Sequence, residues 1–140
     1  MTAPQLYPRY ANPLLDPPRT ALPTHAAMVG AGTIGPDIGY YLKLAVPALK
    51  LTLVDVVQEP LDAAKARFAG YAAKSVKRGK MKPEMVDKVL GDIVYTTDYD
   101  AIADADLIIE AATENVPLKK KIFGMIEERV SPEAIIASKT

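Results

Sequence analysis

The chain has 140 residues, of which 49% are hydrophobic, so it is long enough for one domain with a hydrophobic core. Its 17 basic and 17 acidic residues give a formal net charge of zero, which argues against nucleic acids and membrane surfaces as electrostatic partners. The absence of cysteine excludes disulfides and thiol catalysis, and a single histidine, His25, argues against a histidine-rich metal site, so we predict no metal.

Residues 1–24 form a proline-rich arm that we expect to be extended or irregular. They hold six of the twelve prolines, and proline fixes φ and removes a backbone donor. The arm lacks the basic start and apolar stretch of a signal peptide, and no apolar run of the chain reaches the roughly 20 residues of a membrane span. We therefore expect a cytoplasmic protein whose folded domain occupies residues 25–140.

From His25 onward, apolar runs typical of buried strands alternate with helical patterns. Such an alternation predicts an α/β fold, with a doubly wound, mostly parallel sheet covered on both faces. Two successive helices within residues 59–90 predict a helical hairpin inserted into that fold. In chain order we predict a strand at 26–29, a helix at 35–45, a strand at 51–54, helices at 59–78 and 83–90, a strand at 93–96, a short helix at 98–103, a strand at 107–112, a helix at 117–130 and a strand at 134–138.

The most informative motif is a glycine turn, Gly30-Ala31-Gly32-Thr33-Ile34-Gly35, between the first predicted strand and helix. Asp55 ends the next strand, twenty residues after Gly35. Gly30 permits a tight turn, Gly32 lets a pyrophosphate approach the backbone, and Gly35 lets the helix pack closely on the strand. This spacing is the fingerprint of a dinucleotide-binding unit, in which Asp55 binds the ribose hydroxyls and favours NAD over NADP. The alternative, a purely structural turn, is disfavoured by the surrounding strand, helix and acid.

Polar residues follow the fourth predicted strand, where ligands of doubly wound sheets bind. Glu114 and Lys119 are placed to reach the ribose or nicotinamide half of a dinucleotide, but a capping acid and a solvated helix face are equally compatible with the pattern. His25 precedes the first strand, at the end opposite to the glycine turn, and we interpret it as structural. A group of basic residues near the hairpin turn is either a solvated helix end or an anion site: Lys74, Lys77, Arg78, Lys80 and Lys82.

Taken together, His25 to Thr140 resembles the Rossmann-type NAD-binding domain of the 3-hydroxyacyl-CoA dehydrogenases. These enzymes oxidise L-3-hydroxyacyl-CoA to 3-ketoacyl-CoA with NAD, as in fatty acid β-oxidation. Besides the glycine turn and the hairpin, the matching segments are Leu53-Val54-Asp55, Tyr95-Thr96-Thr97-Asp98, Ala105-Asp106-Leu107-Ile108-Ile109-Glu110-Ala111, Glu114-Asn115 with Lys119, and Ala137-Ser138 with Thr140, which is similar to the family's Ser-Asn-Thr-Ser segment.

The resemblance implies a role for each matching segment. It implies an acyl-CoA substrate, with Lys77 and Arg78 near the phosphates of coenzyme A and Ser138 near the reacting part of the substrate. It also implies a homo-oligomer, because the family usually dimerises. With the glycine motif, it gives the set of cofactor-binding residues Gly30, Gly32, Thr33, Ile34, Gly35, Asp55, Ala111, Glu114 and Lys119.

The chain departs from the family at three points. Pro36 and Asp37 replace small residues, and Asp37 is expected to weaken NAD binding if it faces the ligand. Lys139 stands where the family has asparagine, close to the expected nicotinamide site. The family's catalytic histidine lies beyond the segment that ends at Thr140, so we expect this chain to be part of a longer dehydrogenase that binds NAD without turnover when alone. Its last strand is expected to leave an exposed sheet edge that favours self-association.

Two other interpretations remain at this point. The chain can be the NAD domain of another hydroxyacid or nucleotide-sugar dehydrogenase. It can also be a non-catalytic NAD-binding module that acts as a sensor or an interaction domain.

Overall fold

A computed structural model describes residues 22–139, so most of the predicted arm at 1–24 lies outside the described residues, as does Thr140. Within that part, the observed elements follow the predicted order closely. They are β1 (His25–Val29), α1 (Ile34–Ala45), β2 (Lys50–Val54), α2 (Gln58–Lys77), α3 (Pro83–Leu90), β3 (Ile93–Thr96), the 3-10 helix η2 (Tyr99–Ile102), β4 (Leu107–Glu110), α4 (Val116–Glu127) and β5 (Ile135–Ser138).

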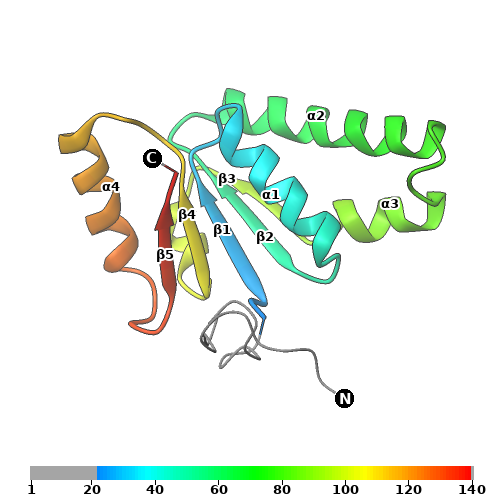
Figure 1. The fold of residues 1–140 in the computed structure, drawn as a ribbon. Helices are drawn as coiled ribbons and strands as arrows, with labels where there is room; N and C mark the ends of the chain where they lie inside the picture. Colours follow the sequence, from blue (N-terminus) through cyan, green and yellow to red (C-terminus); the bar gives the residue numbers. More distant parts are fainter. Residues whose placement is uncertain (1–21, 140) are drawn as a thin grey trace, which may run out of the picture.

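The strands form one sheet with the order β3-β2-β1-β4-β5, and each neighbouring pair is parallel. From β1 the chain winds outward through β2 and β3, then crosses back to β4 and continues to β5 (Figure 1). The predicted Rossmann-type, doubly wound sheet is therefore confirmed. The strand order reverses between β1 and β4, which is where ligands bind in such sheets, outside the carboxyl ends of the strands.

Helices cover both faces of the sheet, and β1 contributes to two separate cores. Ala26 and Met28 pack on the side of α1, α2 and α3, whereas Ala27 and Val29 pack on the side of η2 and α4. This division follows from the period of two along a strand. On the first side Phe68 is fully buried, and its ring centroid lies 5.2 Å from that of Tyr40.

The helical hairpin is confirmed as α2 and α3, which run out from the sheet and turn back beside it (Figure 1). Gly79 has a φ of +72° in the turn, a conformation that glycine adopts without a Cβ penalty. Pro83 opens α3 at a position where its missing N–H leaves no hydrogen bond unmade. No helix of the described residues is long and apolar enough to cross a membrane.

Three elements differ from the sequence expectation in type or by more than one residue at an end. The short helix predicted at 98–103 is a 3-10 turn, begun by the Asp98 carboxylate, which accepts a 2.9 Å hydrogen bond from the Asp100 amide. Helix α4 ends at Glu127 rather than near residue 130, and beyond it the Arg129 amide donates to the Ile126 carbonyl, three residues back, in the tighter turn common at helix ends. Strand β4 ends at Glu110 rather than at residue 112, because the amides of Ala112 and Thr113 donate to the Glu110 side chain.

Buried polar side chains at the amino ends of the strands are held by local partners. The His25 ring lies at the end of β1 opposite to the glycine turn, with Nε2 2.8 Å from the Thr52 hydroxyl and Nδ1 3.1 Å from an Asp104 carboxylate oxygen. The fully buried Lys43 donates from Nζ to the Pro47 and Leu49 carbonyls at 2.6 and 2.7 Å. Burial lowers the pKa of Lys43. The two backbone carbonyls hold its ammonium group in place.

Candidate functional site

The glycine turn places its three glycines in different environments. Gly30 has a φ of +108°, and a Cβ atom there would lie 2.6 Å from the Ala112 Cα atom. A Cβ atom on Gly35 would overlap the carbonyl oxygen of Gly30, so both positions require glycine for packing. A Cβ atom on Gly32 would meet nothing within 4 Å. The turn therefore leaves open space at Gly32, where the sequence predicts the approach of a pyrophosphate.

Asp55 joins the end of β2 to this turn. Its Oδ2 atom accepts a 2.8 Å hydrogen bond from the Ala31 amide, and its Oδ1 atom accepts a 3.0 Å bond from the Val57 amide. Each carboxylate oxygen can accept a second hydrogen bond, so Asp55 keeps acceptor capacity for a ligand. The sequence predicted a ribose-binding acid but not its second task of fixing the glycine turn.

A pocket of about 330 Å³ lies beside Asp55, between the glycine turn and α4. Its walls are largely apolar side chains from the segment after β2 and from α4, among them Val56, Ile122 and Met125. These residues were missed by the sequence analysis because apolar residues on a helix face fit a core equally well. A larger hollow of about 420 Å³ lies at the opposite ends of β4 and β5, and none of the predicted site residues lines it.

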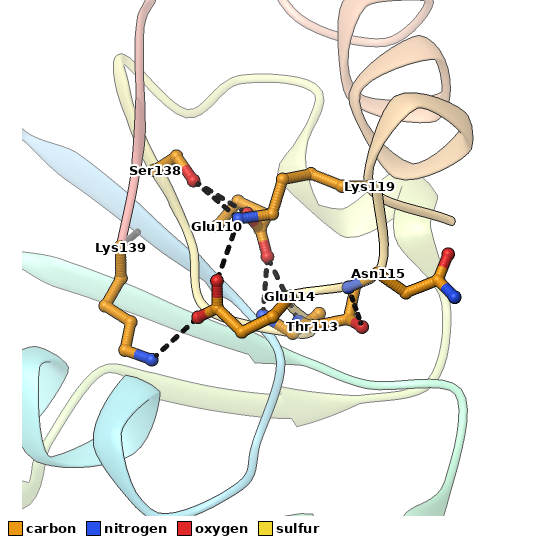
Figure 2. A network of polar contacts seen from close by, with 8 residues as sticks. Glu110, Thr113, Glu114, Asn115, Lys119, Ser138 and Lys139 are labelled. Atoms are coloured by element: carbon orange, nitrogen blue, oxygen red, sulfur yellow. Dashed lines mark hydrogen bonds and ion pairs between the residues drawn. The ribbon is translucent and has the colours of Figure 1, made fainter. Parts of the chain in front are cut away.

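A fully buried carboxylate, Glu110, ends β4 and organises the polar residues that follow it (Figure 2). Its Oε2 atom accepts hydrogen bonds from the Ala112 and Thr113 amides at 2.7 and 3.4 Å. Its Oε1 atom accepts one from the Ser138 hydroxyl at 2.9 Å and lies 3.2 Å from the Lys119 ammonium. Strand β4 stops here because these two amides bond to the Glu110 side chain.

The ionisation of Glu110 follows from these donors. Burial alone would raise its pKa, but the hydrogen bonds from Ala112, Ser138, Lys119 and Thr113 together lower the pKa below its ordinary value. Glu110 is therefore a carboxylate at neutral pH. The sequence analysis assigned it no role, although a charged residue at the end of an apolar strand was the available signal.

The predicted residues Glu114, Lys119 and Ser138 are brought together around this carboxylate (Figure 2). The Lys119 ammonium lies 3.3 Å from the Ser138 hydroxyl and 3.9 Å from a Glu114 carboxylate oxygen. Lys139, which also departs from the family pattern, places its ammonium 3.1 Å from the other Glu114 oxygen. Two acids and two lysines thus form one cluster across the ends of β4, α4 and β5.

Asp37 is engaged by side chains of α2. Its Oδ1 atom accepts hydrogen bonds from the Arg67 Nε atom at 3.3 Å and from the Tyr71 hydroxyl at 3.1 Å. The negative charge that the sequence analysis placed near the start of α1 is therefore paired with a guanidinium. Lys77 and Arg78 lie at the far end of α2, about 15 Å along the helix axis from Arg67, the residue of α2 that contacts the glycine turn. They are not brought together with the residues of the glycine turn.

Comparison with known proteins identifies the family. A model of the family described as "3-hydroxyacyl-CoA dehydrogenase, NAD binding domain" matches residues 25–140. The chain belongs to this family. Its fold and its coenzyme, NAD, are those that the sequence predicted, and the match favours this family over the nucleotide-sugar dehydrogenases considered above.

Solved structures agree with this assignment. The (S)-3-hydroxybutyryl-CoA dehydrogenase of Ralstonia eutropha is 34% identical with a TM-score of 0.77, over 85% of this chain and 41% of that one. The 3-hydroxybutyryl-CoA dehydrogenase of Escherichia coli is 30% identical with a TM-score of 0.79, over 86% of this chain and 25% of that one. FadB2 of Mycobacterium tuberculosis is 28% identical with a TM-score of 0.78, over 86% of this chain and 42% of that one. The chain thus spans less than half the length of each.

Proposed function

We propose that this chain is the coenzyme-binding part of an enzyme that oxidises L-3-hydroxyacyl-CoA to 3-ketoacyl-CoA. The observation that carries the proposal is the open space at Gly32 beside Asp55, in a chain that matches the family over residues 25–140. The NAD bound there would take up the hydride from the substrate. The residues of this chain would bind and orient the coenzyme.

The glycine turn suits the adenosine diphosphate half of NAD. The amides of Thr33 and Ile34 lie at the start of α1, where N–H groups lack helical partners and the helix dipole favours an anion. Asp55 would bind the adenosine ribose, and its charge would repel the additional phosphate of NADP. The apolar pocket beside Asp55, with Val56 and Met125 in its walls, would take the adenine ring.

The cluster around Glu110 would serve the nicotinamide half. Ala111, Glu114 and Lys119 lie where the chain leaves β4, next to the reversal of strand order. The Ser138 hydroxyl, held by Glu110, would contact the reacting oxygen of the substrate. Lys77 and Arg78 would bind phosphates of coenzyme A at the outer end of the hairpin.

The proton of the substrate hydroxyl requires a base. Among the described residues the single histidine, His25, lies at the wrong end of β1, so we expect the base to come from outside this chain and the chain alone to bind NAD without turnover. In the described part, β5 is an edge strand, which favours self-association and accords with a homo-oligomer. We place the enzyme in the cytoplasm.

Calorimetric titration with NADH and with NADPH tests the proposal. We expect NADH to bind at least tenfold more tightly than NADPH, because Asp55 would repel the 2′-phosphate. Asp55→Asn keeps an acceptor for the Ala31 amide but loses the charge, and it should reduce this preference. Asp62→Asn, on α2 and bonded to Gln58, is the matched control and should leave it unchanged. Equal binding of the two coenzymes, or no binding of NADH, would contradict the proposal.

A further inference from the structure

The Gly32 carbonyl lies just before the start of α1. In a helix the carbonyl oxygen of residue i accepts a hydrogen bond from the amide of residue i+4. For Gly32 that residue is Pro36, which has no amide hydrogen. Gly32 lies one residue before the N-cap residue Thr33, so its carbonyl is not part of the helical ladder, and a donor to it comes from outside α1, at the end that faces the proposed diphosphate site.

Arg67, from the middle of α2, supplies this donor. Its Nη2 atom lies 3.4 Å from the Gly32 carbonyl oxygen and 3.2 Å from the Thr33 carbonyl oxygen. Its Nε atom is held by the Asp37 carboxylate at 3.3 Å, and the Tyr71 hydroxyl steadies the same carboxylate oxygen at 3.1 Å. The guanidinium thus lies against the turn, with its side chain 28% exposed.

These contacts act on two particular peptide units. The carbonyl of Gly32 belongs to the same peptide unit as the amide of Thr33, and the carbonyl of Thr33 belongs with the amide of Ile34. A cation hydrogen-bonded to a carbonyl oxygen draws electron density from its peptide unit, so the N–H group becomes a stronger donor. The two amides that Arg67 strengthens in this way are the two proposed to face the diphosphate.

We propose that Arg67 is a positioning residue for the coenzyme diphosphate, acting through the peptide units of Gly32 and Thr33 without touching the ligand. It also offsets the charge of Asp37, which lies in the first turn of α1 near the proposed anion site. Asp37, one of the departures from the family pattern, is then part of this arrangement. This inference rests on the proposed coenzyme site.

The test compares Arg67→Met with Arg129→Met. Arg129 is a matched control: its side chain is 27% exposed, its Nε atom is paired with Asp100 at 2.9 Å, and its Nη1 atom donates to the Met125 carbonyl, away from the glycine turn. The probes are ADP, which carries a diphosphate, and adenosine, which carries none. We expect Arg67→Met to weaken ADP binding roughly fivefold to tenfold and to change adenosine binding less than twofold. Arg129→Met should leave both affinities unchanged.

A second measurement follows the amides directly. In the ligand-free protein, the amide proton resonances of Thr33 and Ile34 should move upfield in Arg67→Met and stay in place in Arg129→Met. Arg67→Lys keeps a cation with fewer donors, so its ADP affinity should fall between those of the wild type and Arg67→Met. If Arg67→Met does not fold, the ADP and adenosine affinities of Arg67→Lys, compared with those of the wild type, test the inference instead.

The outcomes separate this inference from the proposed function. Equal loss of ADP and adenosine binding in Arg67→Met would show a merely structural role, and affinities like those of Arg129→Met would show no role. Either result overturns the inference while NADH binding by the wild type still supports the coenzyme site. If the wild type binds neither NADH nor ADP, the proposed function and this inference fall together.

Discussion

Replacing Glu110 by glutamine should destabilise the protein through one lost charge-assisted contact. A glutamine has nearly the same shape, and its amide oxygen can keep the hydrogen bonds from the Ala112 and Thr113 amides. Its NH₂ group would then stand where the carboxylate oxygen faces the Lys119 ammonium at 3.2 Å, so two donors would meet. The Ser138 hydroxyl can rotate to accept from the new NH₂ group.

The magnitude follows from what is lost. A hydrogen bond to a charged group contributes about 1.5–3 kcal/mol, and removing a buried charge returns part of that through relieved desolvation. We therefore expect the free energy of unfolding to fall by about 2 kcal/mol at pH 7. The matched control is Glu114→Gln. The Glu114 side chain is 63% exposed and is paired with Lys119 and Lys139, so this substitution should cost less than about 1 kcal/mol.

The effect depends on pH in a defined direction. The pKa of Glu110 is lowered in the folded state, so its carboxylate stabilises the fold above the unfolded-state pKa, near 4.5, and that stabilisation is lost as pH falls through the lower folded-state pKa. The difference between the wild type and Glu110→Gln should therefore shrink below pH 4.5. Asp106 also has a lowered pKa and contributes equally to both proteins, so it cancels in the difference.

Urea unfolding followed by far-ultraviolet circular dichroism provides the assay, since the chain contains no tryptophan. Measurements at pH 7 and at two values below 4.5 give the difference in unfolding free energy directly. The reasoning is refuted if Glu110→Gln costs no more than Glu114→Gln at pH 7. It is also refuted if the difference from the wild type stays constant as the pH falls.

The remaining predictions concern the glycine turn and the start of α4. Gly32→Ala should change the free energy of unfolding by less than about 0.5 kcal/mol but weaken NADH at least tenfold in calorimetry, because its Cβ atom enters space left open for the ligand. Gly35→Ala should cost roughly 2–3 kcal/mol in urea unfolding, because its Cβ atom overlaps the Gly30 carbonyl, and equal stability of the two variants would contradict the geometry. Asn115→Ala should cost about 1 kcal/mol by the same assay, because the side chain accepts a 2.9 Å hydrogen bond from the Leu118 amide, and Asn115→Asp should retain most of the stability.

Much of the fold could be predicted because its signals are local. Continuous apolar runs mark the buried strands, and the glycine turn with Asp55 has the spacing typical of a dinucleotide-binding strand–helix–strand unit. The order of the elements along the chain, with right-handed connections between parallel strands, leaves few sheet topologies. These features require no knowledge of which distant residues meet.

The parts that escaped prediction depend on register and tertiary contact. Glu110 becomes the centre of its cluster because β4 and β5 pair in a register that places it opposite Ser138. Nothing in the sequence near Glu110 specifies a partner 28 residues away. Arg67 likewise meets Asp37 only because α2 packs beside α1, and on the sequence alone it is one more cation on a helix.

The strands on either side of β1 end in the same way, and this explains how the site keeps its shape. Asp55, after β2, accepts hydrogen bonds from the amides of Ala31 and Val57. Glu110, at the end of β4, accepts them from the amides that follow it, at Ala112 and Thr113. Each carboxylate fixes a loop that borders the turn at Gly30, which itself has no side chain to hold it. In the proposed function the glycines would provide access for the coenzyme, and the flanking acids would provide the rigidity that a preorganised phosphate and ribose site requires.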